Sequence, residues 1–453
     1  MPFRRVALTL ILFSALTNSV NAVNCGGTTS CGCTDTVTSD YNLTSNLKCA
    51  PFAFTIGSDN ITIDCQGHNV SGFGFGNGFL VSGRFGVGIR NCSIRDFSNA
   101  LHLYNSSVIV VSNNSFIGDD VGVFLNYSRN STVADNTALN CVQAAVYLLN
   151  STGNNVTANN MSTNSTWASS SSGVYLRNSN FNEVSENTVQ HLQYGVYLLN
   201  SAGNAVRNNT LMNYSDYYPT YGIFLSNSAN NTVLWNTLLS VSTGIFLATS
   251  NNNTVGNNIV RLEYGYGTPR TWTGIDVAGS RFNALVLNRV NLSGDGIIFR
   301  DGSSNNTARE NTLYSSGYGL HVLGAVNNTV ENNTFRWNYV GIYVENSSRN
   351  RIAANVVENS STDGLRFADY ISEGASNNNV ADDNRLCYNG YAGGYYDLYN
   401  GGTNSGSGNT CNRTFNWNDT GTVGCRHLCG ATILVWNQRL TGGWNLVDLP
   451  III

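Results

Sequence analysis

One short phrase is repeated along most of this chain, and the repetition constrains the fold more than any other feature of the sequence. Consecutive copies read "GVYLRNS" at Gly173, "GVYLLNS" at Gly195, "GIFLSNS" at Gly222 and "GIFLATS" at Gly244. Most copies follow one another after about 22 or 23 residues, and a period in this range is typical of a solenoid. One repeat cannot bury its own apolar face, so it must stack on a copy of itself.

Each copy of the phrase alternates apolar and outward residues, as a β-strand does. Ile223 and Leu225 fall on one side of the strand and Phe224 on the other. A second element, "NNTVxxN", follows the phrase, as in residues 230–236 and 327–333, and turns rich in Asn and Gly separate the two. A leucine-rich repeat would show several fixed leucines per unit, which are missing here. The prediction is an all-β, single-stranded parallel β-helix with about 13 coils.

Stacked coils should place equivalent residues in columns with a spacing of about 4.8 Å. One asparagine recurs at the same place in the repeat and is predicted to form a ladder of side-chain amides inside the solenoid. Its members are Asn136, Asn159, Asn187, Asn209, Asn236, Asn258, Asn288, Asn311, Asn333 and Asn355.

The repeat resembles a known superfamily. "GIFLSNSANNTVLWNTL", repeated over residues 54 to about 400, is similar to the right-handed parallel β-helix superfamily, in particular to the NosD-like repeats of carbohydrate-binding and sugar-hydrolase domains. "NITIDCQGHNVSG", at residues 60–72, resembles the opening coil of exported archaeal and bacterial members. The resemblance implies an exported microbial surface protein. It does not define an activity, because the same scaffold is shared by lyases, hydrolases, epimerases, adhesins and binding proteins.

The start of the chain resembles an export signal. Arg4 and Arg5 precede an apolar run, and the small-residue stop "VNA" ends at Ala22. We expect residues 1–22 to be a signal peptide of a secreted or cell-surface protein; a retained membrane anchor is the alternative. No later segment resembles a membrane span. The predicted domain organisation is a signal peptide at 1–22, a Cys-rich cap at 23–53, the parallel β-helix at 54–383, a cap rich in Cys, Gly and Asn at 384–430, and a β-hairpin at 431–453.

Residues 431–453 are predicted to begin a further domain, or to contact a cell-envelope partner or a second copy of the chain. Six cysteines lie near the start of the chain and four near its end, and in an exported chain they favour disulfides. The spacings of Cys31 with Cys33 and of Cys425 with Cys429 also suit a metal, and this alternative remains open. Cys141 stands apart, and an odd number of cysteines predicts one free thiol.

The charge of the chain excludes one class of partner. Charged residues make up 11% of the sequence and the net charge is -4, so no basic stripe is available for nucleic acid. Five His and three Met form no cluster of soft ligands, and no metal or cofactor is predicted. About two dozen Asn-x-Ser/Thr sequences either carry glycans or serve only as turns.

The outward residue of the repeated phrase is aromatic in six consecutive coils. These residues are Phe124, Tyr147, Tyr175, Tyr197, Phe224 and Phe246. They predict a strip on the surface that binds polysaccharide or glycan; the alternative is that the rings only stabilise the solenoid. Three of the repeats are longer than the others. Their extra residues come just before the strand that carries the aromatic residue, and several of them are themselves aromatic. Trp167, Tyr217, Tyr266 and Trp272 are predicted to form the wall of a groove beside the strip.

The same outward column then becomes polar. If the chain has an activity, Asp276 is predicted to act as acid or base, His321 to assist it, and Arg300 to hold the carboxylate of an acidic sugar. The protein would then be a lyase or glycoside hydrolase of acidic polysaccharide, and a lyase would bring calcium. A third candidate is a structural envelope or adhesion protein without a ligand site.

Overall fold

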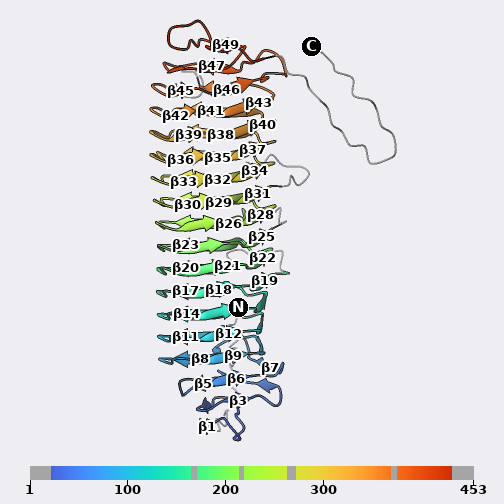
Figure 1. Ribbon diagram of the computed structural model, residues 1–453. Coiled ribbons are helices and arrows are strands. Elements are labelled where there is room, and N and C mark those ends of the chain that lie inside the picture. The colour runs from blue at the N-terminus through green and yellow to red at the C-terminus, as the bar shows by residue number, and fades with distance from the viewer. Residues whose placement is uncertain (1–21, 165–170, 214–218, 263–271, 369–374, 431–453) are drawn as a thin grey trace, which may run out of the picture.

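The structure is a computed structural model that describes residues 22–164, 171–213, 219–262, 272–368 and 375–430. These residues wind into one long solenoid of strands, from β1 (Asn24–Cys25) at one end to β49 (Thr414–Phe415) at the other (Figure 1). No helix occurs within them, so the all-β prediction is confirmed. The predicted signal peptide, except Ala22, and the predicted hairpin at 431–453 lie outside the described residues.

Most coils contribute one strand to each of three parallel sheets. In one coil, β26 (Tyr221–Ser226) is followed by β27 (Thr232–Leu234) and β28 (Thr237–Leu239), and the chain then enters β29 (Thr243–Ala248) beside β26. The sheet that contains β26 has strands of six residues in most coils, and we call it the long-strand sheet. Its other six-residue strands are β8 (Asn77–Ser82), β11 (Asn99–Tyr104), β14 (Val121–Asn126), β17 (Ala144–Leu149), β20 (Ser172–Arg177), β23 (Tyr194–Leu199), β32 (Thr273–Ala278), β35 (Asp295–Arg300), β38 (Tyr318–Leu323) and β41 (Val340–Glu345).

The described solenoid has slightly more coils than predicted. The three sheets contain 18, 16 and 15 described strands, which gives about 15 coils rather than about 13. The additional coils lie in the Cys-rich ends, where β2 (Thr36–Val37) and β47 (Leu398–Asn400) pair with the rest of the long-strand sheet. These strands lack the repeated phrase, so periodicity alone missed them.

The glycine that begins most copies of the repeated phrase is needed because adjacent coils approach closely there. Tyr221 pairs with Thr243 and Ile223 with Ile245, so the register passes over Gly222 and the strand bends there. A Cβ atom on Gly222 would lie 2.6 Å from the carbonyl oxygen of Gly244 in the next coil and 2.2 Å from a methyl carbon of Leu238. A residue in this column therefore needs a very small side chain.

The predicted asparagine ladder is present inside the solenoid. The backbone N–H and the side-chain amide of Asn187 both donate to Oδ1 of Asn209, each at 3.0 Å. Asn209 in turn donates through its amide to Oδ1 of Asn236 at 3.0 Å and to the carbonyl of Val184 at 2.9 Å. The ladder satisfies buried backbone groups at the turns and fixes the register of the coils.

The sequence analysis missed a second asparagine ladder. Asn204 donates to Oδ1 of Asn231 at 3.1 Å, and Asn231 donates to Oδ1 of Asn253 at 3.1 Å. The signal was the "NNT" of several repeats, as at residues 230–232 and 327–329. The first asparagine, such as Asn230, adopts a positive φ at an exposed turn, and the second is buried in the ladder.

The cysteines pair as expected in the end regions. Five disulfides join Cys25 to Cys31, Cys33 to Cys49, Cys65 to Cys92, Cys387 to Cys429 and Cys411 to Cys425. Cys141 is free and buried, which confirms the prediction of one free thiol. The spacings of Cys31 with Cys33 and of Cys425 with Cys429, which also suited a metal, arise from disulfides to other partners.

Asp119 is a fully buried carboxyl group in a turn column of the interior. Its Oδ1 accepts a hydrogen bond from the Phe97 N–H at 2.8 Å, whereas Oδ2 has no partner. Burial, with Asp96 and Asp120 nearby, raises the pKa of Asp119 from 3.8 to about 8. Between these two pH values the folded chain binds more protons than the unfolded chain, so stability decreases as the pH rises.

Asp119→Asn is therefore expected to remove this pH dependence. Asn can keep the acceptor for Phe97 without a buried charge. Between pH 5 and 7 the wild type should lose roughly 2–3 kcal/mol of unfolding free energy relative to the variant. Denaturant unfolding followed by circular dichroism at both pH values measures the difference. Parallel pH profiles of the two proteins would contradict the prediction.

Candidate functional site

The candidate site is the outward face of the long-strand sheet, where the predicted aromatic column is present. Strand pairing places Tyr175 beside Tyr197, Tyr197 beside Phe224, and Phe224 beside Phe246. The centroids of these adjacent rings are 4.9 Å apart, and the ring planes differ by at most 5°. Tyr147 and Phe124 continue the stack with centroid distances of 4.7 and 5.0 Å.

The stacking determines which parts of the rings a ligand can contact. Each inner ring has both faces covered by its neighbours, so the column exposes ring edges and the hydroxyls of its tyrosines. Tyr147 is only 6% exposed, and the other five rings are partly buried. A sugar on the column would therefore contact ring edges and hydroxyls rather than ring faces.

Two further tyrosines widen the aromatic surface in its middle. Tyr194 lies 5.0 Å from Tyr197, and Tyr221 lies 5.2 Å from Phe224, measured between ring centroids. Tyr194 and Tyr221 also stack on each other at 5.4 Å. Strict alternation would turn these two residues inward, but the bend at each glycine turns them outward. The six rings of the column and these two tyrosines are called the aromatic face below.

Four tyrosine hydroxyls of the aromatic face, those of Tyr175, Tyr194, Tyr197 and Tyr221, have raised pKa values and stay protonated at neutral pH. Burial, together with Tyr147 and Tyr197, raises the pKa of Tyr175 to about 12. Burial also raises the pKa values of Tyr194, Tyr197 and Tyr221. These hydroxyls can therefore donate as well as accept hydrogen bonds.

The three insertions leave the solenoid at one corner, beside the aromatic face. They lie between β19 (Asn160–Ser162) and β20, between β25 (Thr210–Met212) and β26, and between β31 (Ile259–Arg261) and β32. Trp167, Tyr217 and Tyr266 lie outside the described residues. Trp272 is partly buried and packs against the hydrophobic core.

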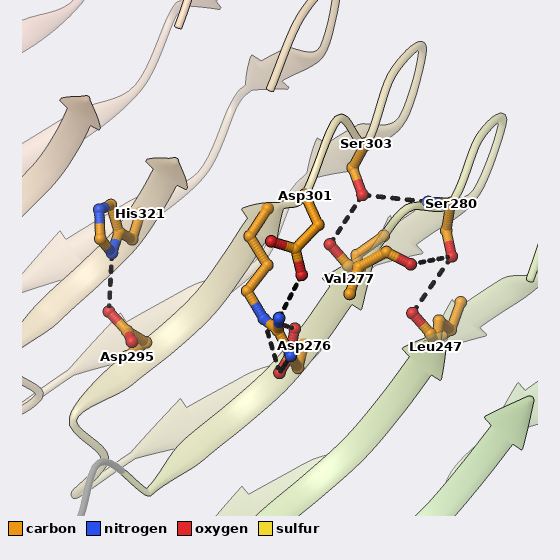
Figure 2. A network of polar contacts seen from close by, with 10 residues as sticks. Leu247, Asp276, Val277, Ser280, Asp295, Asp301, Ser303 and His321 are labelled. Atoms are coloured by element: carbon orange, nitrogen blue, oxygen red, sulfur yellow. Dashed lines mark hydrogen bonds and ion pairs between the residues drawn. The ribbon is translucent and has the colours of Figure 1, made fainter. Parts of the chain in front are cut away.

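An ion-pair network occupies the face next to the aromatic rings. Arg300 donates from Nε to both carboxylate oxygens of Asp276, at 2.9 and 3.2 Å, and from Nη2 to Asp276 Oδ2 at 3.0 Å. Its Nη1 pairs with Asp301 (Figure 2). Burial raises the pKa of Asp276, and Arg300 opposes this shift. The guanidinium also lies 5.5 Å from the centre of the Phe246 ring.

His321 forms a separate contact group on the same face. Its Nδ1 lies 3.3 Å from Asp295 Oδ1, as Figure 2 shows, and its Nε2 lies 3.3 Å from Glu345 Oε2. Ile298 occupies the coil between Asp276 and His321 in the same column. The structure therefore keeps the two predicted catalytic residues in separate groups. The sequence analysis missed Glu345, which lies at the end of its strand rather than in the column.

The pairing of Arg300 does not suit the role predicted for it. Three of its donor contacts go to Asp276 and a fourth to Asp301, so binding a sugar carboxylate would break the existing pairs. Four carboxylates surround one guanidinium and one imidazole here, and this negative excess repels an acidic sugar. The four carboxylates are Asp276, Asp295, Asp301 and Glu345.

The described residues offer no metal centre. They contain no group of three His, Cys, Asp or Glu side chains that could hold a metal ion. Within the same ranges, no helix is long and apolar enough to cross a membrane.

Two family models match the sequence. The model described as periplasmic copper-binding protein (NosD) matches residues 64–213 and again 163–273, and the model of the right handed beta helix region matches residues 273–439. Together with the three parallel sheets, these matches identify the chain as a member of the right-handed parallel β-helix superfamily. The donor set does not fit the copper of the NosD description, because ten of the 11 cysteines form disulfides and the remaining one is buried.

No curated protein matches the sequence. Among solved structures, a mutant of DFA-IIIase from Arthrobacter chlorophenolicus A6 in complex with DFA-III is 14% identical, with 56% of this chain and 82% of that chain covered and a TM-score of 0.45. A mutant of the tailspike protein of E. coli bacteriophage HK620 in complex with pentasaccharide is 12% identical, with 77% and 72% covered and a TM-score of 0.47.

Proposed function

We propose that this chain is an exported or cell-surface protein that binds a linear polysaccharide or glycan along the aromatic face. The observation that carries the proposal is the continuous set of outward rings, broadened by Tyr194 and by Tyr221, which begins the strand after the second insertion. Tyrosine edges supply apolar contact to sugar C–H groups, and protonated hydroxyls supply hydrogen bonds to sugar hydroxyls. The regular spacing of the rings suits a ligand that is itself a repeating chain.

Export is supported by the disulfides. Five of them in one chain are typical of an oxidising compartment outside the cytoplasm. The predicted signal peptide at 1–22 and the glycans on Asn-x-Ser/Thr sequences belong to the same proposal. Asn105, Asn230 and Asn327 are exposed at positive φ, where a glycan would extend into solvent.

The polar residues support a catalytic function less well than a binding function. Asp276 is 7% exposed and bound by Arg300, and His321 lies in another contact group. Neither group leaves an open acid and base facing the same reacting atom. We therefore assign the polar residues to the binding surface.

The aromatic face is tested by removing two adjacent rings. Tyr197→Ala combined with Phe224→Ala is expected to weaken binding to the best ligand on a glycan array by about tenfold or more. The matched control is Tyr399→Ala combined with Phe415→Ala, because these rings stack at 4.7 Å in the same sheet but beyond the aromatic face. Circular dichroism verifies that both variants are folded.

Two results would overturn the proposed function. One is a wild type that binds nothing on the array, and the other is equal binding by the folded double variant and the wild type. Tyr175→Phe combined with Tyr197→Phe separates the two kinds of contact, since it keeps the stack and removes two hydroxyls. A binding loss in this variant assigns part of the affinity to hydroxyl hydrogen bonds.

A further inference from the structure

Charge is distributed very unevenly along the outward face of the long-strand sheet. The eight six-residue strands from β8 to β29 contain one Asp, Glu, Lys or Arg residue in total, and it is Arg177. The next four, β32, β35, β38 and β41, contain Asp276, Asp295, Arg300 and Glu345, and Asp301 follows β35 directly. From β20 to β41 the face therefore has one cation that no ion pair among the described residues engages, then an uncharged aromatic stretch, then a negative end in which carboxylates outnumber Arg300.

Arg177 is placed to contact a ligand on the aromatic face. It is the last residue of β20, it is exposed, and its guanidinium lies near the Tyr147, Tyr175 and Tyr197 side chains. Its register partners in the coils below and above are Leu149 and Leu199. No carboxylate of the described residues forms an ion pair with it, in contrast to Arg300.

The positive and negative positions are separated by a fixed length. Four coil steps lead from β20 through β23, β26 and β29 to β32, which corresponds to about 19 Å along the solenoid. The rings between them are Tyr197, Phe224 and Phe246, at the spacing given above. A chain-like ligand on this face therefore meets a cation at one end and carboxylates at the other.

We propose that Arg177 determines specificity by binding an anionic substituent of the glycan, a carboxylate or a sulfate, and that the negative end at β32 to β41 excludes a second anionic group. The inference rests on the proposed function. It identifies the ligand as a mainly neutral glycan with sparse acidic groups, held in one direction along the aromatic face. A polymer of uronic acids is excluded, because its other carboxylates would face Asp276 and Asp295.

The experiment compares glycans that differ only in charge. An array carries several linear backbones, each as a neutral oligosaccharide, with one terminal uronate, with one terminal sulfate, and as the all-uronate form. The wild type should bind a singly charged form about fivefold more tightly than the neutral form of the same backbone, and the all-uronate form more weakly than either. The preference should decrease when salt is raised, since Arg177 is exposed.

Arg177→Gln should bind the neutral and singly charged forms of the same backbone equally. Arg177→Lys should keep part of the preference. Arg281→Gln is the matched control, because Arg281 is also exposed but lies in a turn outside the aromatic face. It should bind as the wild type does.

The outcomes separate this inference from the proposed function. Equal binding of neutral and singly charged forms by the wild type, tightest binding of the all-uronate form, or an unchanged preference in Arg177→Gln would each overturn the inference and leave glycan binding standing. Binding to none of the backbones would overturn both. The uronate and sulfate forms show which anion Arg177 prefers.

Discussion

Asn209→Ala is expected to lower the free energy of unfolding by about 4 kcal/mol. The change leaves the backbone N–H and the side-chain amide of Asn187 without their shared acceptor, and it leaves the Val184 carbonyl without its donor. The Asn187 amide keeps the carbonyls of Val156 and Ser185 as acceptors, whereas the buried Asn187 N–H and Val184 carbonyl each lose this partner at a cost of about 1–3 kcal/mol. The cavity left by the deleted amide adds to the loss. Urea denaturation followed by circular dichroism in the β region measures the loss.

The neighbouring residue provides the control. Asn208 is exposed with a φ of 56°, so Asn208→Gly fits the backbone and touches nothing in the ladder. It should change the unfolding free energy by less than about 1 kcal/mol. Similar losses in the two variants would mean that the ladder does not stabilise the solenoid in the way described here.

Gly244→Val is expected to destabilise the fold by about 3 kcal/mol or more. A Cβ at this position would lie 2.4 Å from the carbonyl oxygen of Gly274 and 2.5 Å from Cγ1 of Val260. The Gly274 carbonyl belongs to the next coil and Val260 is a buried core residue of the same coil, so the added atoms would push two coils apart and displace a core side chain. Thermal unfolding and the yield of folded protein report the effect.

Gly88→Val is the matched change in a different strand, β9 (Gly88–Arg90). The nearest atom to a Cβ there is the Thr62 side-chain oxygen at 3.3 Å, and a β-branched residue suits a strand. Its stability should remain close to that of the wild type. If Gly244→Val were equally well tolerated, close approach between coils would not be the reason for the glycine column.

The repeat made the fold predictable because one coil determines the next. The spacing of Gly222 and Gly244 gave the coil length, the alternation of Ile223 and Leu225 gave the core, and Asn209 and Asn236 gave the ladder. The terminal coils were not predicted, because β2 and β47 belong to disulfide-linked segments that lack the repeated phrase. A repeat pattern predicts only the coils that share it, and the terminal coils of this solenoid have different sequences.

The candidate site was predicted less completely, for physical reasons that concern side-chain direction. The repeat placed Tyr197 over Phe224, but it could not show that stacking would cover the ring faces. Tyr194 was overlooked because the bend at Gly195 reverses the alternation. The partners of Arg300 depend on rotamers of Asp276 and Asp301, which no spacing in the sequence specifies.

The hydrogen bonds of the asparagine ladder do not depend on the length of the loops that leave the solenoid. The bond from the Asn159 amide to Asn187 spans 28 residues and includes an insertion, and the bond from Asn187 to Asn209 spans 22 residues, yet both measure 3.0 Å. A segment added at that corner leaves the hydrogen bonds of the coil unchanged. Loops of different length and sequence can therefore be inserted or deleted at this corner without changing the core.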